Sequence, residues 1–241
     1  MSPPPRLWIL ADAHAGAIAE ADASLLRLID RATALGVDLL VLGDLFLAWL
    51  GLPRFQTAFQ QDVLRRFRAH RASGRRVDFV VGNRDYLVAE GERGQSFDDV
   101  FEEAVRPIGG VPTLVVHGDQ LNPADHGYRA WHAISRSQPV SRLLSHIPSR
   151  WAAGRAEAIE RRLRRHGRAY KTGDLPMEAL YALGRRAAQL GAKQALCGHF
   201  HHDRLLDVPG GVPVIIAPAW LDQRRILEVD GDGGLRSIDP F

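Results

Sequence analysis

Residues 7–14 read Leu-Trp-Ile-Leu-Ala-Asp-Ala-His, an apolar run that ends on an acid and a histidine. The run from Leu7 to Ala11 predicts a buried strand. We expect the segment just after it to stay extended, so that Asp12 and His14, two residues apart, point to the same side. One carboxylate and one imidazole could then reach a single cation. Because such pairs are common on ordinary protein surfaces, the remainder of the chain decides what this one means.

Polar clusters follow four further apolar runs. These runs, each with the cluster after it, are Asp38–Leu42 with Gly43-Asp44, Val77–Val81 with Gly82-Asn83-Arg84-Asp85, Thr113–His117 with Gly118-Asp119, and Gln194–Cys197 with Gly198-His199-Phe200-His201. Amphipathic stretches over residues 21–35 and 55–72 predict helices between the first strands. Strands separated by helices indicate an α/β sheet with largely parallel connections. Such sheets bind ligands at the carboxyl ends of their strands, so we expect the first four clusters to gather at one edge of one sheet.

Residues 122–174 interrupt this alternation. They predict helical pieces broken by Pro139 and Pro148, and the stretch from Ser141 to Lys171 holds eight arginines and one lysine against two glutamates. Its net charge of +7 leaves −4 for the rest of a chain whose total is +3. We expect a single domain over residues 1–241 with residues 122–174 inserted as a helical cap. Residues 175–190 predict another helix, and four short segments predict an antiparallel second sheet: Arg204–Val208, Val212–Ala217, Arg225–Val229 and Leu235–Ile238.

The composition fits a protein of a reducing compartment. With 241 residues, 46% of them hydrophobic, the chain can bury a sizeable core. Its single cysteine, Cys197, excludes a disulfide framework and is expected to be a buried strand residue. No apolar run approaches the ~18 residues of a membrane span, and the proline-rich start does not predict a secretory signal. We therefore expect a cytoplasmic protein.

The polar clusters together provide a complete ligand set for two metals. Two metals that share one carboxylate lie ~3.5–4 Å apart and hold a hydroxide for in-line attack on phosphorus. Oxygen and nitrogen ligands without a thiolate favour Mn²⁺, with Fe, Zn, Co or Mg as alternatives. The set therefore predicts a two-metal phosphoesterase. We expect one metal to be held by Asp12, His14, Asp44 and His201, and the other by Asp44, Asn83, His117 and His199.

Arg84 and Asp85 stand beside these ligands. The Arg84 guanidinium offers a fixed positive charge to a phosphate, and it does not deprotonate at ordinary pH, so it can only stabilise charge. We expect Asp85 to pair with a neighbouring histidine or arginine rather than to bind a metal.

The five clusters in this order resemble the calcineurin-like metallophosphoesterases. Four segments look more narrowly like the UDP-2,3-diacylglucosamine pyrophosphatases of lipid A biosynthesis, and the resemblance runs from Leu7 to Phe241. These segments are GDLFLAWLG (43–51), GNRDYL (82–87), HGDQLNPADHGYRAWH (117–132) and the final DPF (239–241). The chain departs from that family at Leu52-Pro53-Arg54, where the family has a run of aspartates, and over most of the cap.

This resemblance implies a fold, a reaction and a set of substrate contacts. The implied fold is a four-layer α-β-β-α sandwich. The implied reaction hydrolyses the pyrophosphate of UDP-2,3-diacylglucosamine to UMP and 2,3-diacylglucosamine 1-phosphate, with Arg84 and Asp44 as catalytic residues. The glucosamine, uridine or phosphates would contact Asn83, Arg84, Asp125, Tyr128 and Lys171. Tyr128 has an alternative role, since it could pack with Trp131 along an amphipathic helix.

The basic cap leaves two interpretations open. Its arginines could form a solvated helix face, or they could meet acidic phospholipid while apolar side chains line an acyl pocket, namely Leu143, Leu144, Ile147 and Trp151. Given the resemblance, we expect the second, with a UDP-linked acylated glucosamine as substrate and a peripheral location on the inner face of the inner membrane. No nucleic acid and no obligate protein partner is expected. The alternatives are a metallophosphoesterase for another nucleotide or phosphodiester, a nuclease, and a non-catalytic scaffold, which the complete ligand set argues against.

Overall fold

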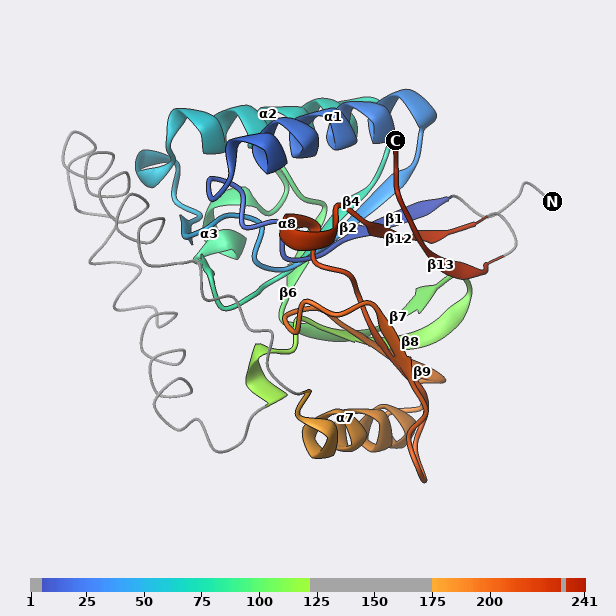
Figure 1. Cartoon of the computed structure of the whole chain (residues 1–241). Coiled ribbons are helices and arrows are strands. Elements are labelled where there is room, and N and C mark those ends of the chain that lie inside the picture. Colours follow the sequence, from blue (N-terminus) through green and yellow to red (C-terminus); the bar gives the residue numbers. More distant parts are fainter. Residues whose placement is uncertain (1–5, 122–174, 231–232) are drawn as a thin grey trace.

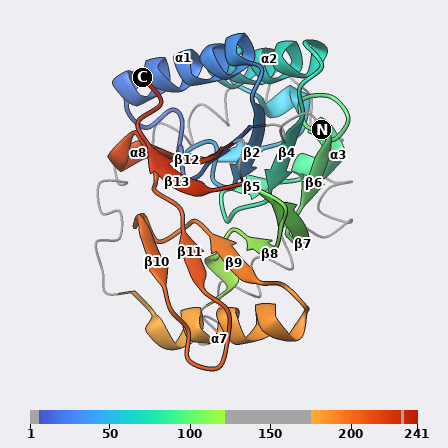
Figure 2. The same cartoon turned by 90° about the vertical axis from the view of Figure 1, so that its right-hand side faces the viewer.

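The computed structural model describes residues 6–121, 175–230 and 233–241. Their strands form one sheet in the order β13-β12-β1-β2-β4-β6, a second in the order β10-β11-β9-β8-β7, and a short β3-β5 ribbon (Figure 1, Figure 2). The strands are β1 (Leu7–Leu10), β2 (Asp38–Leu42), β3 (Trp49–Leu50), β4 (Val77–Val80), β5 (Asp85–Tyr86), β6 (Asp99–Phe101), β7 (Glu103–Ile108), β8 (Val111–Val116), β9 (Gln194–Cys197), β10 (Arg204–Leu206), β11 (Val214–Ile216), β12 (Ile226–Val229) and β13 (Leu235–Ile238). The α-helices are α1 (Ala19–Leu35), α2 (Ala58–Ala72), α3 (Val88–Glu92), α7 (Met177–Gln189) and α8 (Trp220–Gln223), and two 3-10 helices are η1 (Pro53–Phe55) and η2 (Asp119–Leu121).

The described elements stack in four layers. Helices α1 and α2 cover the outer face of the first sheet, the second sheet faces its inner side, and α7 covers the outer face of the second sheet (Figure 1). Each interface between layers has its own hydrophobic cluster. Leu25 and Phe67 belong to the one under α1 and α2, Leu180 to the one under α7, and Leu40 and Val115 to the one between the sheets. The predicted α-β-β-α sandwich is confirmed.

Strand β1 is buried on both faces, as its sequence predicts. Trp8 and Leu10 belong to the cluster under the helices, whereas Ile9 and the following Ala11 belong to the cluster between the sheets. Side chains of a strand alternate between its two faces. Because both faces are covered here, the strand appears in the sequence as an unbroken apolar run.

The four C-terminal strands do not form one antiparallel sheet, so that prediction is wrong. Strands β10 and β11 extend the second sheet, in which β11 pairs parallel with β9. Strands β12 and β13 belong instead to the first sheet, in which β12 lies antiparallel to β1. Short apolar segments indicate that a strand is buried but not which sheet it joins, and this is why the sequence did not separate the two pairs.

Local signals account for the ends of the main helices. The Thr57 hydroxyl accepts a hydrogen bond from the Gln60 N–H, and the Gln60 side chain accepts one from the Thr57 N–H, which is a capping box for α2. The predicted start at residue 55 is therefore about one turn early. Helix α1 ends at Gly36, whose φ of 63° suits glycine. Among the described helices, none is long and apolar enough to cross a membrane.

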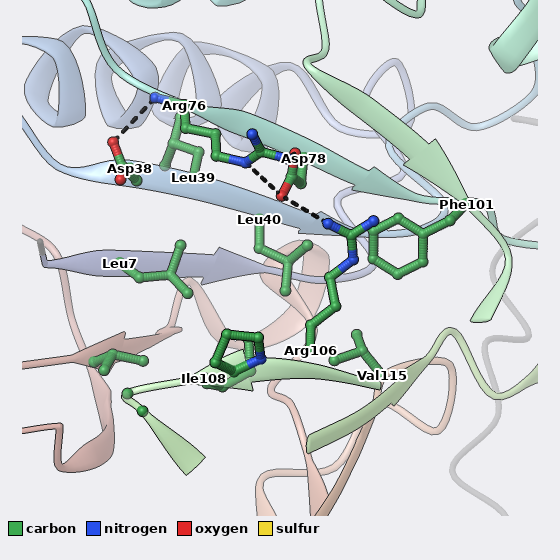
Figure 3. A pocket seen from close by; sticks show the side chains of 14 residues that line it. Leu7, Asp38, Leu39, Leu40, Arg76, Asp78, Phe101, Arg106, Ile108 and Val115 are labelled. Atoms are coloured by element: carbon green, nitrogen blue, oxygen red, sulfur yellow. Dashed lines mark hydrogen bonds and ion pairs between the residues drawn. The ribbon is translucent and has the colours of Figure 1, made fainter. Parts of the chain in front are cut away.

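A cavity of about 360 Å³ lies between the two sheets, at the edge where the parallel strands begin. Leu7 and Leu40 contribute to its apolar walls (Figure 3). At its rim the Arg76 Nε donates to the Oδ2 of Asp78 at 2.9 Å, and the Arg106 guanidinium lies 3.9 Å from the same oxygen. The polar clusters follow the opposite ends of these strands, so the cavity is separate from them.

Glu228 of β12 joins three strands of the first sheet. Its side chain is only 2% exposed, accepts hydrogen bonds from Trp8 Nε1 at 3.0 Å and from Arg236 at 2.8 Å, and pairs with Arg6. Trp8 and Arg236 lie on β1 and β13, the two neighbours of β12. Burial raises the pKa of Glu228, but the hydrogen bonds outweigh burial and hold the pKa at about 2.

Replacing Glu228 with glutamine is expected to lower the free energy of unfolding by about 2 kcal/mol near pH 7. A carboxyl whose pKa is lower in the fold than in the unfolded chain contributes its full stability above the unfolded pKa of 4.5. This contribution is lost as the pH falls towards about 2, so the difference between Glu228→Gln and the wild type should shrink over that range. Urea unfolding of both proteins at several pH values measures the difference. A difference that stays constant with pH would contradict this role of the charge.

Candidate metal centre

Five of the seven predicted metal ligands lie on strained turns that follow strands. Asp12 and His14 follow β1, Asp44 follows β2, and His199 and His201 follow β9. All five have φ angles between 41° and 69°, a region that residues with a Cβ seldom adopt. Seven non-glycine residues of the described chain have positive φ, so these five are most of them. Backbone strain concentrated in this way is typical of functional sites.

The expectation of extended backbone at Asp12 and His14 is wrong. Their φ angles are 49° and 41°, so both residues are left-handed. The neighbouring strand end holds them there, because the Asp12 N–H donates to the Gly43 carbonyl at 3.3 Å and the His14 N–H donates to the Asp44 carbonyl at 2.9 Å. The two side chains therefore meet through contact with a neighbouring strand rather than through the alternation of a single strand.

Two buried carboxylates, those of Asp12 and Asp44, lie in the middle of the centre. They are 1% and 2% exposed. One oxygen of each is fixed by a backbone amide: Asp12 Oδ2 accepts from the His199 N–H and Asp44 Oδ1 from the Arg84 N–H, both at 2.8 Å. The other oxygen of Asp12, Oδ1, is buried and accepts no hydrogen bond. A buried charged oxygen without a donor is costly unless a cation compensates it.

Three histidines direct their Nε2 atoms at these carboxylates. His14 Nε2 lies 3.9 Å from Asp12 Oδ1 and 3.8 Å from Asp44 Oδ2, and His201 Nε2 lies 3.8 Å from Asp12 Oδ1. His117 Nε2 lies 3.6 Å from Asp44 Oδ1 and 4.0 Å from Asp12 Oδ1. These distances exceed hydrogen bonds but fit pairs of ligand atoms that share an ion about 2.0–2.2 Å from each. The ligand atoms form two groups, Asp12–His14–His201 and Asp12–Asp44–His117, each within 4.8 Å.

The His117 ring is oriented for metal binding. Its Nδ1 lies 2.8 Å from the Leu42 carbonyl oxygen, which can only accept, so Nδ1 carries a proton and donates it. Nε2 then faces the two carboxylates, and it is buried without a hydrogen-bond partner. A backbone carbonyl on one ring nitrogen commonly fixes a histidine whose other nitrogen binds a metal.

Asn83, His199 and Arg84 lie beside this group. The centroid of the His199 ring is 5.2 Å from that of His117. The Asn83 Oδ1 and the Arg84 Nε are both buried and form no hydrogen bond. The Arg84 N–H donates to Asp44 Oδ1, which places this residue beside the candidate ligands. Burial and the positive charge of Arg84 both lower the pKa of His14. An amide oxygen and a guanidinium nitrogen in this state are suited to a metal and to an anion, respectively.

Asp85 links two strand ends through backbone amides. Its Oδ2 accepts hydrogen bonds from the Asp44 N–H at 2.7 Å and from the Gly82 N–H at 2.9 Å. Nothing in the motif itself indicates these two amide contacts. They fix the turn that carries Asp44 against the turn that carries Asn83 and Arg84.

Two glycines of the clusters allow the close approach of backbone and ligands. A Cβ on Gly43, whose φ is 83°, would lie 2.3 Å from Nδ1 of His117. A Cβ on Gly82 would lie 2.4 Å from Oδ1 of Asp44. No side chain fits in either place, so the glycines of Gly-Asp and Gly-Asn are required by the packing of the ligands.

The metal-free centre takes up protons. Burial raises the pKa of Asp44 to about 8, with further contributions from Asp85 and Asp12, and burial also raises the pKa of Asp12. Burial lowers the pKa of His117, but Asp44 and Asp12 outweigh it and raise that pKa to about 9. In the absence of metal, burial therefore favours a proton on the carboxyls or on His117. Metal binding at such a site would displace these protons.

The ligands come from two sheets, so the expectation of one edge of one sheet is wrong. Asp12 and Asp44 follow strands of the first sheet, whereas His117, His199 and His201 follow β8 and β9 of the second. An apolar run predicts a buried strand but not which of two facing sheets it joins. The result is an Asp/His site between the carboxyl ends of both sheets, consistent with two metal ions.

The predicted substrate contacts Asp125, Tyr128 and Lys171 lie outside the described residues. The same is true of the whole predicted cap, residues 122–174, with its apolar side chains.

One contact of the centre is absent from the motifs. Nδ1 of His201 lies 2.5 Å from Oδ2 of Asp222, which is 21 residues further along the chain in α8. The sequence around Asp222, Trp-Leu-Asp-Gln, has no neighbouring ligand-type residue that would mark it. Only the packing of α8 against the strand ends makes this residue part of the centre.

The chain is similar to bacterial proteins named UDP-2,3-diacylglucosamine hydrolase. It is 30% identical over 222 residues to that of Pseudomonas putida and 29% identical over 219 residues to that of Neisseria meningitidis serogroup B, and each alignment covers 90% of both chains. No protein-family model matches it. A solved structure of a hypothetical protein from Pyrococcus horikoshii shares the fold, with a TM-score of 0.51 at 13% identity over 97% of this chain and 86% of that one. Together with the Asp/His centre, these similarities show that the chain is a hydrolase of the metallophosphoesterase family, the one that includes the UDP-2,3-diacylglucosamine hydrolases.

Proposed function

We propose that this metallophosphoesterase hydrolyses the pyrophosphate of UDP-2,3-diacylglucosamine, releasing UMP and 2,3-diacylglucosamine 1-phosphate. The observation that carries the proposal is the pair of Asp/His groups that share the buried Asp12, in a chain that aligns over 90% of its length with relatives of that name. The same centre would serve other phosphoesters. The lipid substrate is therefore supported by the relatives and by the segments that resemble their family, not by the metal centre alone.

We propose Mn²⁺ as the metal, bound at two positions. One ion would be held by Asp12, His14, Asp44 and His201, and the other by Asp44, Asn83, His117 and His199. The donors fit, because they are nitrogen and oxygen atoms and because Asp12 Oδ1, Asn83 Oδ1 and His117 Nε2 are buried without hydrogen bonds. Divalent ions at these positions supply charge stabilisation at the phosphate oxygens and lower the pKa of bound water.

Arg84 would act on the pyrophosphate through its charge. Its backbone N–H holds Asp44 in place at 2.8 Å, while its Nε is buried and forms no hydrogen bond. A guanidinium stays protonated at ordinary pH, so it can bind and orient the phosphates but does not transfer a proton. Donors placed where negative charge develops lower the barrier of such reactions.

We further propose that residues 122–174 form a cap that holds the acyl chains and meets an acidic membrane surface, at the inner face of the inner membrane. Support comes from the sequence, in which a net charge of +7 is mixed with Leu143, Leu144, Ile147 and Trp151. Within that segment Asp125, Tyr128 and Lys171 would contact the polar part of the substrate. A soluble nucleotide would need no such apolar residues.

A series of substrates with shorter acyl chains is expected to show a stepwise fall in kcat/KM. Each buried methylene contributes ~0.8 kcal/mol, which corresponds to about fourfold per methylene. Turnover is measured with metal-depleted protein reloaded with Mn²⁺, using UDP-2,3-diacylglucosamine, its shorter analogues, UDP-glucose and bis-nitrophenyl phosphate. UDP-glucose should be nearly inert, because it lacks acyl chains.

Two outcomes of this series separate the substrate from the chemistry. If kcat/KM does not depend on acyl length while bis-nitrophenyl phosphate is hydrolysed, the chain is a metallophosphoesterase for another nucleotide or phosphodiester. If no phosphoester is hydrolysed with any divalent metal, the proposed function fails altogether.

A further inference from the structure

The His201 ring lies between two carboxylates. Its Nε2 faces Oδ1 of Asp12 at 3.8 Å, on the side of the metal centre, and its Nδ1 lies 2.5 Å from Oδ2 of Asp222 on the other side. The ring is also stacked on that of His14, with 5.4 Å between centroids and 30° between planes. His201 itself has a φ of 56°, so its backbone is strained. Both ring nitrogens and one ring face thus have a neighbour that restricts the orientation of the ring.

Helix α8 holds Asp222 in a fixed position relative to the ligands. Trp220, two residues before Asp222, is fully buried in the cluster under α1 and α2. The Trp220 N–H donates to the Ala11 carbonyl at 2.9 Å, and the Leu221 N–H donates to the Asp12 carbonyl at 3.2 Å. The helix is thus bonded to the same stretch of backbone that carries Asp12. The Asp222 side chain is 46% exposed, but the two residues before it are hydrogen-bonded to the backbone of Ala11 and Asp12.

We propose that Asp222 is a positioning residue, which orients His201 so that Nε2 presents its lone pair to the metal held with Asp12 and His14. An ionised carboxylate can accept hydrogen bonds but cannot donate them. The proton of the neutral His201 ring is therefore on Nδ1, which faces Asp222. The same contact holds the ring in one orientation, as an acceptor behind a ligating histidine commonly does. The inference rests on the metal centre and not on the lipid substrate, so a negative acyl-length result would not affect it.

The affinity for metal is expected to depend on Asp222 at one position only. Loss of a carboxylate behind a ligating histidine typically weakens metal binding about 10–100-fold. Titration of metal-depleted Asp222→Ala with Mn²⁺ by calorimetry should show one weakened step of that size and a second step close to wild type. Asp222→Asn should be intermediate, because its amide oxygen still accepts from Nδ1 but carries no charge. Activity lost at low Mn²⁺ should return at saturating Mn²⁺.

Asp203→Ala is a matched control for the loss of one negative charge. Asp203 is exposed, lies two residues after His201, and faces Arg225 at 3.6 Å rather than a ring nitrogen. This variant should bind Mn²⁺ within about twofold of wild type.

The tautomer of His201 gives a readout that does not depend on metal or activity. In metal-free wild type, nitrogen NMR of the neutral imidazole should show the His201 proton on Nδ1, and Asp222→Ala should lose this preference. His201→Gln identifies the signals.

Three results would overturn the proposal. One is a proton on Nε2 of His201 in the wild type. Another is Mn²⁺ binding by Asp222→Ala that matches wild type at both positions. The third is equal weakening of both positions together with a lowered Tm, in Asp222→Asn as well, which would make Asp222 a general structural residue.

Discussion

Asp44→Ala is expected to lower kcat by at least about 10³-fold, because both metal positions lose a ligand at once. Asp44 faces one histidine of each proposed metal position: its Oδ2 is 3.8 Å from His14 Nε2 and its Oδ1 is 3.6 Å from His117 Nε2. Among the described residues, Asp12 is the one other carboxylate that faces both of these histidines. Steady-state turnover with saturating Mn²⁺ and the metal content of the purified variant measure the effect together. Less than two ions per chain should remain bound.

Asp44→Asn separates loss of the metal from loss of the fold. The amide oxygen can still accept the 2.8 Å hydrogen bond from the Arg84 N–H, but it carries no charge for two ions. Since burial raises the pKa of Asp44 to about 8 in the fold, the carboxyl destabilises the metal-free protein increasingly as pH rises from the unfolded value of 3.8 towards 8. Metal-free Asp44→Asn should therefore be at least as stable as metal-free wild type near pH 8, yet it should stay inactive when Mn²⁺ is added. Asp207→Ala, at an exposed position after β10, should behave as wild type. Full activity in either Asp44 variant would rule out the shared-ligand role.

The sequence predicted the ends of the strands that carry the candidate ligands, because the signal there is local. Asp38–Leu42 and Gln194–Cys197 are strands with the predicted bounds, and each is followed directly by its polar cluster. A strand covered on both faces appears as an unbroken apolar run, and the first polar group after it marks its end. Element type and candidate ligands could therefore be identified without knowledge of the tertiary structure.

Sheet membership could not be predicted, because it depends on contacts between distant segments. His117 follows β8, which pairs antiparallel with β7 and parallel with β9 rather than with any strand of the first sheet. Similarly, β12 pairs with β1 through contacts such as that between Trp8 and Glu228, 220 residues apart. No periodicity within a strand encodes such a choice.

The left-handed turns were missed for a related reason. Asp12, His14, Asp44, His199 and His201 are residue types that usually adopt negative φ, and no glycine marks their own positions. For Asp12 and His14 the conformation is held by hydrogen bonds to the neighbouring strand end, as between the His14 N–H and the carbonyl of Asp44. Asp222 was missed because it reaches His201 only through the packing of α8. Both features are properties of the assembled fold.

Arg84→Ala is expected to lower kcat about 10²–10³-fold while Mn²⁺ binding stays close to wild type. The guanidinium lies beside the ligands without being one of them, since its Nε is buried without a hydrogen bond and its charge helps to lower the pKa of His14. Arg84→Lys keeps the charge but loses the planar fork, so its kcat should fall between those of wild type and Arg84→Ala. Turnover at saturating substrate and calorimetric Mn²⁺ titration measure the two effects. Arg185→Ala, on the exposed side of α7, is the matched control and should change neither.

The pH dependence of the Arg84 variants distinguishes charge stabilisation from proton transfer. Because a guanidinium does not titrate at ordinary pH, Arg84→Ala should lower the pH–rate profile uniformly and leave both of its limbs in place. The Lys variant should also keep both limbs as long as its ammonium remains charged. Loss of one limb in Arg84→Ala would mean that the position controls a proton after all. Wild-type kcat in Arg84→Ala would mean that the pyrophosphate does not contact this side chain. The phosphates would then bind elsewhere around the two carboxylates.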